Sequence, residues 1–237
     1  VTLLDLSSKE GARNQIAENA RERILKSRPP LLVEKNIIDL ISAGNIEDDF
    51  NLVSDADWIV EAVVEKIDIK QNIYKKIEKL RKVDSIVSSN TSTIPLKVLS
   101  EKMSDEMKKN FCITHFFNPV RYMRLLELVT EPINDKEKIN TLKSFCDEKL
   151  GKGVILCKDT PGFLGNRVGV YAMQVAMTEA FKMGLTIEEA DAVFGRPMGI
   201  PKTGVFGLYD LIGIDLMADV LKSFIKELPK DDPFHKV

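Results

Sequence analysis

Residues 58–64, Trp58-Ile59-Val60-Glu61-Ala62-Val63-Val64, are the stretch that decides the fold of this chain. The run is almost wholly apolar and lacks the alternation of a strand with one face in water, so it predicts a parallel strand covered on both faces. Residues 67–80 then carry apolar side chains at helical spacing, and Ser85–Ser88 predicts a second short strand. A strand, a helix and another strand in this order are typical of a parallel α/β sheet.

Further alternating elements flank this unit on both sides. Together they predict a doubly wound α/β sheet over residues 1–157. We expect strands over Val1–Asp5, Phe111–Thr114, Leu125–Val129 and 153–156, and helices from Ser7 or Ser8 to Ser27, over 31–43, directly after Pro95 and over 135–150.

The pattern changes after Cys157, where no further strand is evident. Thr160-Pro161 is typical of a helix start, with a capping residue followed by proline. Thr186 with Glu189 three residues later predicts a capping box. We expect helices over 162–183, after Thr186, over 204–212 and over 215–227, so that residues 158–237 form an all-α second domain.

Composition limits the possible functions. A net charge of −2 over 237 residues gives no electrostatic basis for binding nucleic acid or an anionic membrane. No signal peptide or membrane-spanning run is visible. Two histidines and three scattered cysteines lack the spacing of a metal site. An odd number of cysteines fits a reducing compartment, and we expect a cytoplasmic protein without a metal.

A histidine and a carboxylate stand out as a candidate catalytic pair. His115 lies in Thr114–Pro119, and Glu127 lies inside the apolar run Leu125–Val129. Burying an unpaired carboxylate costs roughly several kcal/mol, so such a group usually has a partner. Two strands joined through an Asn-Pro turn would bring the imidazole and the carboxylate together, as in a general base with a fixed tautomer. A hydrogen-bonded core histidine and an exposed strand acid are the alternatives.

Other polar residues follow predicted strands, where ligands bind in open α/β sheets. Glu65 and Lys70 follow the strand 58–64, and Ser89–Thr93 follows the next one. Ordinary positions in a first helical turn, and capping, are the alternatives for these residues. Asn166 lies early in the first helix of the second domain, where asparagine is a poor helix former unless it faces solvent or has a role.

The chain opens inside an element that ends in Asp5. A strand ending in Asp or Glu is typical of the second strand of a nucleotide-binding unit, whose carboxylate bonds a ribose hydroxyl. The Gly-rich loop expected about 20 residues earlier is absent from the sequence. We therefore expect that the parent protein has further residues before residue 1.

Taken together these segments resemble the 3-hydroxyacyl-CoA dehydrogenase family. The resemblance spans nearly the whole chain and is weakest over 6–54 and past 216. The matching motifs are, in order, D, V-E-A-V-V-E-x(4)-K, S-N-T-S, H-F-F-N-P, L-x-E-L-V, K-D-T-P-G-F-x-x-N-R and P-M-G.

The resemblance implies a Rossmann-type domain that binds NAD, a helical domain, and an acyl-CoA substrate between them. It implies that the enzyme oxidises (S)-3-hydroxyacyl-CoA to 3-oxoacyl-CoA in fatty-acid β-oxidation, and that it forms a homodimer. The implied catalytic residues are His115 as the base, Glu127 as its orienting carboxylate, Ser92 on the reacting oxygen and Asn166 from the second domain. The implied cofactor contacts are Asp5, Glu65, Lys70, Ser92 and Asn118, and Arg21 and Arg28 are weaker candidates for the CoA phosphates.

Two departures from the family pattern concern the parent protein. The chain stops at Val237, before the lysine- and glycine-rich segment with which the family usually continues. The loop Gly195–Gly204 resembles that of larger members, which carry an enoyl-CoA hydratase module on the same chain. We therefore expect a larger multifunctional fatty-acid oxidation protein.

Two alternatives to a hydroxyacyl-CoA dehydrogenase remain open. One is an inactive or truncated relative that keeps the fold as a structural, dimerising domain. The other is a sugar-acid dehydrogenase of the same superfamily, although its motif after the histidine more often contains P-V-N-P than the Phe116-Phe117 found in this chain. Acyl chain length and the direction of the reaction are not determined by the sequence.

Overall fold

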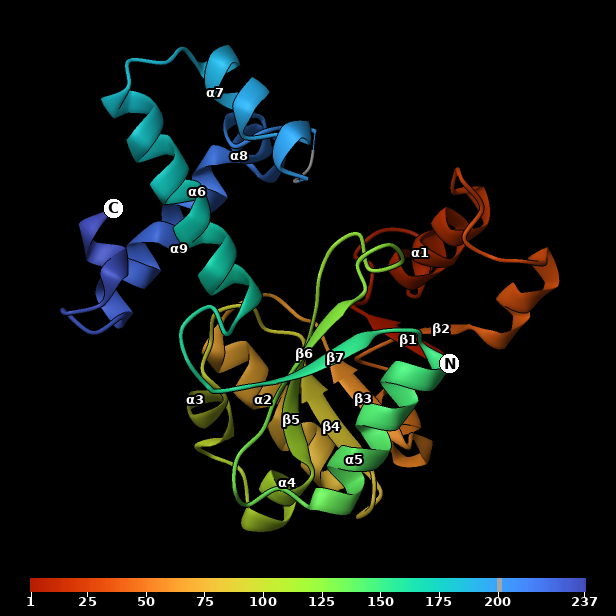
Figure 1. Ribbon diagram of the computed structural model, residues 1–237. Helices are drawn as coiled ribbons and strands as arrows, with labels where there is room; N and C mark the ends of the chain where they lie inside the picture. The colour runs from red at the N-terminus through yellow and green to blue at the C-terminus, as the bar shows by residue number, and fades with distance from the viewer. Residues whose placement is uncertain (200–201) are drawn as a thin grey trace. The chain divides into compact units, whose positions relative to one another are not determined.

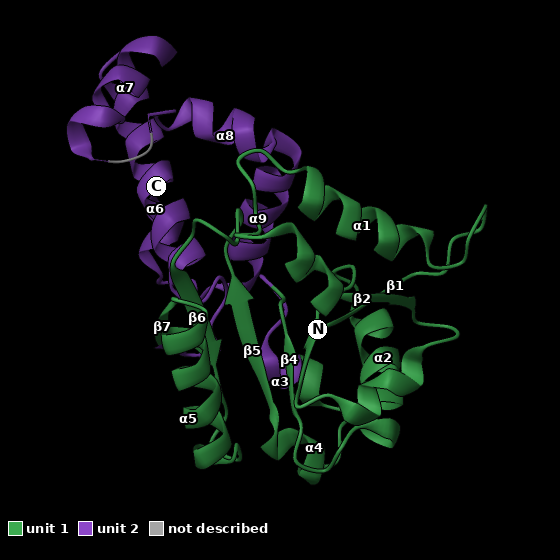
Figure 2. Cartoon of the chain, turned by 90° about the vertical axis from the view of Figure 1, so that its right-hand side faces the viewer, with its two compact units in different colours: residues 1–91, 99–155 green, residues 92–98, 156–237 purple. Residues whose placement is uncertain are grey.

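The computed structural model describes residues 1–199 and 202–237. The chain divides into two compact units, coloured separately in Figure 2. Unit 1 comprises residues 1–91 and 99–155, and unit 2 comprises residues 92–98 and 156–237. The short segment 92–98 therefore belongs to unit 2, although the residues on both sides of it in the sequence belong to unit 1.

Unit 1 is built on a five-stranded sheet with the order β3-β4-β5-β6-β7 (Figure 1). Strands β3, β4 and β5 are parallel, and β6 is antiparallel to β5. A separate parallel pair is formed by β1 and β2. The strands are β1 (Thr2–Asp5), β2 (Ser42–Asn45), β3 (Trp58–Glu61), β4 (Ile86–Ser89), β5 (Phe111–Phe116), β6 (Leu125–Val129) and β7 (Gly153–Cys157).

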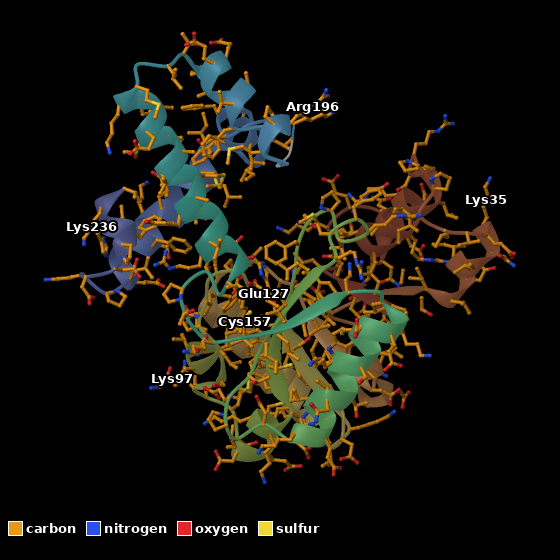
Figure 3. All side chains as sticks on the ribbon, in the orientation of Figure 1. Lys35, Lys97, Glu127, Cys157, Arg196 and Lys236 are labelled. Atoms are coloured by element: carbon orange, nitrogen blue, oxygen red, sulfur yellow. The ribbon has the colours of Figure 1, made fainter. Side chains whose placement is uncertain are left out.

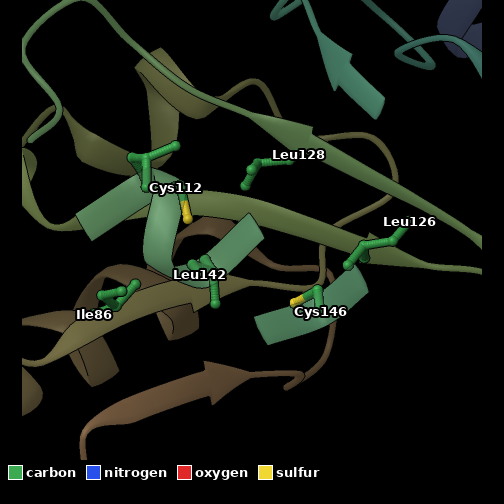
Figure 4. Close-up of a cluster of buried hydrophobic side chains, with 7 residues drawn as sticks. Ile86, Cys112, Leu126, Leu128, Leu142 and Cys146 are labelled. Carbon is green, nitrogen blue, oxygen red and sulfur yellow. The ribbon is translucent and has the colours of Figure 1, made fainter. Parts of the chain in front are cut away.

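Helices α2 (Ile67–Leu80) and α5 (Lys136–Ser144) cover opposite faces of the large sheet (Figures 1 and 2). On the α2 face, Tyr74 packs edge-on against Phe111 with ring centroids 5.0 Å apart. The α5 face buries a cluster of aliphatic and cysteine side chains, shown in Figure 4. Burial raises the pKa of one of these thiols, Cys146, to about 11. Because both faces are covered, the strands are rich in apolar residues on both sides.

Unit 2 is helical, and among its described residues only 156–157, the end of β7, are in a strand. Its core joins the longest helix to the last one through Val170, Met217 and Phe224. The capping box of Thr186 and Glu189 is present as predicted. A mostly parallel sheet covered by helices and followed by a helical unit is a Rossmann-like arrangement with a helical second domain, which confirms the predicted fold class. The helices are α6 (Gly165–Lys182), α7 (Ile187–Val193), α8 (Phe206–Ile212) and α9 (Ile214–Glu227).

Shorter elements complete the described chain. None of the helices in residues 1–199 and 202–237 has the length and apolar composition needed to cross a membrane. The remaining elements are α1 (Gln15–Lys26), α3 (Leu96–Ser100) and α4 (Asp105–Lys109), 3-10 helices over Lys35–Leu40, Phe50–Asp55, Arg196–Met198 and Pro233–Lys236, and a π-helical turn over Phe145–Lys149.

Several predicted boundaries are wrong. The expected helix over 31–43 is instead the 3-10 helix Lys35–Leu40 followed by β2, because pairing with β1 overrides the weak local preference of Ser-Ala-Gly-Asn. The first helix begins at Gln15 rather than at Ser7 or Ser8. The strand expected over 58–64 ends at Glu61, whose side chain is engaged in a buried polar cluster at the strand end.

Two predicted helices are shorter than expected. The helix over 135–150 is α-helical to Ser144 and continues as the π-helical turn. Helix α6 begins at Gly165 rather than at Gly162, because Gly162 and Phe163 both have positive φ, of 73° and 47°. Within the loop 195–204, Ile200 and Pro201 lie outside the described residues, so the interpretation of that loop stays a prediction.

Candidate active site

The histidine and the carboxylate meet across one strand pair. His115 on β5 and Glu127 on β6 are direct partners in the antiparallel register. His115 Nδ1 lies 2.6 Å from Glu127 Oε2. The residues are 4% and 0% exposed, and Glu127 is labelled in Figure 3. An ionised carboxylate only accepts hydrogen bonds, so a contact of this kind with an ionised Glu127 has the proton on Nδ1.

The connection between the two strands is held by a buried lysine that the sequence analysis missed. Lys152 is 7% exposed and donates from Nζ to the carbonyls of Val120 and Met123, at 2.9 Å for Met123. Its ammonium also lies 5.8 Å from the centre of the Phe116 ring. A buried ammonium with carbonyl partners fixes this loop, which carries the exposed Asn118.

The strand end that bears His115 has further supports. The side chain of Asn90, in the loop after β4, accepts a hydrogen bond of 3.0 Å from the main-chain N–H of Phe116. The rings of His115 and Phe117 lie 4.5 Å apart at an angle of 58°. The imidazole is therefore bordered by an aromatic ring as well as by its carboxylate.

Glu61, the last residue of β3, is a second buried carboxylate with many donors. Its Oε1 accepts from Lys70 Nζ at 2.8 Å and from the N–H of Val63 at 2.7 Å. Its Oε2 accepts from Ser89 Oγ at 2.7 Å and from the Tyr74 hydroxyl. Burial, together with the Glu61 charge, raises the pKa of Tyr74 well above its usual range, so the phenol stays a donor.

Glu65 and Lys70 form an ion pair of 3.1 Å, although they are five residues apart and only residues three or four apart are neighbours along a helix. The spacing rule fails because Glu65 precedes helix α2, which begins at Ile67, and so is not on the helix. Lys70 is 1% exposed and sits between Glu61 and Glu65. The hydroxyl of Thr91 donates to Glu65, which links the ends of β3 and β4.

The other predicted site residues lie in less enclosed positions. Asp5 ends β1, and its Oδ1 accepts the N–H of Leu6 at 2.7 Å. Arg21 pairs with Glu18 on the same helix at 2.9 Å, and Arg28 is exposed beyond the helix end. Ser92 and Asn166 are half-buried and both belong to unit 2.

The sequence around Glu61 indicates a buried carboxylate, as it does for Glu127. Like Glu127, Glu61 is a single carboxylate inside an apolar strand, and the same burial cost predicts a partner for it. Lys152 gave no comparable signal, because its partners are main-chain carbonyls more than twenty-five residues away. Among the residues described by the structure, no group of three or more His, Cys, Asp or Glu side chains could hold a metal ion.

Two family models match adjoining parts of the chain. Residues 1–160 match the NAD binding domain of 3-hydroxyacyl-CoA dehydrogenase, and residues 162–236 match the C-terminal domain of the same enzyme.

Individual relatives agree with this match. A putative fatty acid oxidation complex trifunctional enzyme of Rickettsia felis is 42% identical over the whole chain, which spans 33% of that protein. A probable 3-hydroxyacyl-CoA dehydrogenase of Deinococcus radiodurans is 38% identical over 94% of the chain and 64% of its own length. The crystal structure of (S)-3-hydroxybutyryl-CoA dehydrogenase PaaH1 from Ralstonia eutropha has a TM-score of 0.80 at 26% identity, over 100% of this chain and 81% of that one. With both of its parts matched by the same family, the chain belongs to the 3-hydroxyacyl-CoA dehydrogenase family.

Proposed function

We propose that this chain is the dehydrogenase part of a protein that oxidises (S)-3-hydroxyacyl-CoA to 3-oxoacyl-CoA with NAD in fatty-acid β-oxidation. The observation that carries the proposal is the buried contact of 2.6 Å between His115 and Glu127 at the end of β5. Oxidation of a secondary alcohol needs one base for the hydroxyl proton, and this pair has the geometry of such a base.

In this mechanism His115 Nε2 takes the proton of the substrate hydroxyl. Glu127 keeps the ring in one tautomer and stabilises the imidazolium that forms. NAD, when bound, accepts the hydride that leaves the same carbon. In this proposal Ser92 would bond the reacting oxygen, Asn166 would help to hold the substrate, and Asn118 would contact the nicotinamide.

The residues of unit 1 fit a dinucleotide. Within the part of the chain that the structure describes, Asp5 Oδ2 takes no hydrogen bond, so it can accept one from a ribose hydroxyl. Glu65 and Thr91 follow β3 and β4, at the carboxyl edge where ligands of open α/β sheets bind. Lys70 holds Glu65 from the buried side.

The wider setting is also a proposal. Arg21 and Arg28 are the candidates for the CoA phosphates. The similarity to the putative trifunctional enzyme of Rickettsia felis supports a larger multifunctional parent chain, and an enoyl-CoA hydratase module in it stays a prediction. The homodimer and the cytoplasmic location stay predictions.

The test is NADH oxidation with acetoacetyl-CoA by the full-length gene product. We expect His115→Ala to lower kcat by about 10²- to 10⁴-fold, as for the loss of a general base. We expect Glu127→Gln to lower kcat by more than about tenfold, because the ring loses its orienting charge. Glu137→Gln, which changes an exposed helical carboxylate, is the matched control and leaves kcat unchanged.

Two results would count against the proposal. Equal turnover by the wild type and both active-site variants would remove the mechanism. Turnover of a sugar acid such as gulonate in place of the thioester would assign the site to the other branch of the superfamily.

A further inference from the structure

Two main-chain N–H groups of the segment 92–98 donate to Asp159, in the other part of unit 2. Asp159 accepts the main-chain N–H of Leu96 on Oδ1 at 2.8 Å and that of Lys97 on Oδ2 at 3.1 Å. These N–H groups open helix α3, where they have no partner within the helix. Lys97, labelled in Figure 3, has its side chain at the surface, and only its main-chain N–H bonds to the carboxylate of Asp159.

Helix α3 depends on this contact more than a longer helix would. It has five residues, too few to be stable alone. Pro95 precedes it and donates no hydrogen bond. A carboxylate at the start of a helix both bonds the open N–H groups and opposes the positive end of the dipole. Loss of Asp159 would therefore remove the acceptor of the Leu96 and Lys97 N–H groups and loosen the beginning of α3.

The turn that carries Asp159 is itself fixed. The N–H of Thr160 donates to Lys158 O and the N–H of Phe163 to Thr160 O, both at 2.9 Å. Phe163 is 6% exposed and has a φ of 47°, a backbone conformation that residues other than glycine seldom adopt. A buried residue keeps such a conformation only where its surroundings impose it. The same turn leads directly into α6, whose second residue is Asn166.

We propose that Asp159 is a positioning residue of the substrate site, which holds the Ser92 segment on the turn that begins the Asn166 helix. This inference rests on the proposed function, in which Ser92 and Asn166 contact the substrate. Ser92 precedes Leu96 by four residues, so anchoring Leu96 restricts where the Ser92 hydroxyl lies. The Asp159 carboxylate then links the segment that carries Ser92 to the turn that leads to Asn166.

A matched control exists in the same unit. Asp191 on α7 accepts the N–H groups of Phe206 and Gly207 at 2.8 and 2.9 Å, at the start of α8. It makes the same kind of contact at another helix and lies outside the proposed site. Asp159→Ala and Asp191→Ala thus remove equivalent hydrogen bonds, and only the first concerns Ser92.

The experiment compares these variants and Asp159→Asn in the full-length protein. With acetoacetyl-CoA and NADH, we expect Asp159→Ala to lower kcat/KM by about 10- to 100-fold, the effect of a small displacement of a positioned group. The kcat/KM of Asp159→Asn lies between those of the wild type and Asp159→Ala, because one amide oxygen replaces two carboxylate oxygens as acceptors. Asp191→Ala lowers the denaturation midpoint to a similar extent but leaves kcat/KM and NADH binding, followed by NADH fluorescence, unchanged.

Hydrogen exchange measures the anchoring independently of catalysis. We expect the amides of residues 92–98 to exchange faster in Asp159→Ala and at the wild-type rate in Asp191→Ala. Wild-type exchange of this segment in Asp159→Ala, or equal losses of kcat/KM in the two alanine variants, would overturn the proposal. Inactivity of the wild type would overturn the proposed function, and the exchange result would still decide whether Asp159 anchors the segment.

Discussion

Replacing Lys70 with methionine tests whether its buried ammonium stabilises the fold by pairing with the carboxylates of Glu61 and Glu65. Lys70 Nζ lies 2.8 Å from Glu61 Oε1, 3.1 Å from Glu65 Oε2 and 3.3 Å from the carbonyl oxygen of Val63. Methionine has a similar length and no charge, so Lys70→Met removes the cation that pairs with Glu61. Removing one partner of a buried ion pair costs about 3–5 kcal/mol.

The structure favours the lower end of this range. After the substitution Glu61 keeps three donors, which are the N–H of Val63 and the hydroxyls of Ser89 and Tyr74. Its charge is then unpaired but remains hydrogen-bonded, so we expect a loss of about 3 kcal/mol in the free energy of unfolding. In the double variant Glu61→Gln/Lys70→Met neither charge is left alone, so its loss is smaller than the sum of the single losses by about 1–3 kcal/mol.

Urea denaturation followed by tryptophan fluorescence measures these losses. Trp58 is the single tryptophan of the sequence, and its Nε1 donates to Ser88 Oγ at 2.9 Å, so it reports on this sheet. The exposed pair of Lys82 and Asp57 supplies the control, since Lys82→Met removes a surface ion pair worth about 0–1 kcal/mol. A loss below about 1 kcal/mol for Lys70→Met, or strictly additive losses in the double variant, would refute this balance of buried charges.

Two further predictions concern unit 2. Gly162→Ala should destabilise the protein by more than about 1 kcal/mol, because φ is +73° and the added Cβ would lie 2.3 Å from Phe224 Cζ. Gly169→Ala, inside α6 with nothing within 4 Å, should be neutral or stabilising in the same urea titration, and equal losses would contradict this explanation. The hydrogen bond from Arg167 holds the pKa of Asp232 below its ordinary value of 3.8, so its contribution to stability is present above that pH and is lost as the pH falls through the lowered pKa. Asp232→Asn should therefore melt below the wild type at pH 7 and converge with it in acid, and a difference that persists to the lowest pH would contradict the assignment.

The sequence predicted the elements whose signal is local. The helical period of 67–80, the apolar run beginning at Trp58 and the capping box at Thr186 each lie within a few residues, and each element is present. The contact between His115 and Glu127 could also be predicted from neighbouring sequence, since only twelve residues and one turn separate them. A lone carboxylate in an apolar strand needs a partner, and the chain offers only two histidines.

Distant pairing explains what could not be predicted. Strand β2 has no strand-forming residues and exists because it pairs with β1, about forty residues earlier. Helix α6 starts after Gly162 and Phe163 because both have positive φ, and at Gly162 an added Cβ would meet Phe224, sixty-two residues later. For β2 and for Gly162, the residues in contact are forty or more positions apart, so the neighbouring sequence does not reveal the contact.

By itself, then, the sequence determined the alternation of strands and helices, the family, and the candidate base with its carboxylate, because hydrophobic period, turn residues and motif spacing are properties of neighbouring residues. Only the tertiary structure decided that Lys70 is buried between Glu61 and Glu65, and that residues 92–98 are bonded to Asp159, sixty-three residues away from Leu96. Such contacts form because a buried charge or an open helix end takes whichever partner the fold brings within hydrogen-bonding distance, and that partner can lie anywhere in the chain.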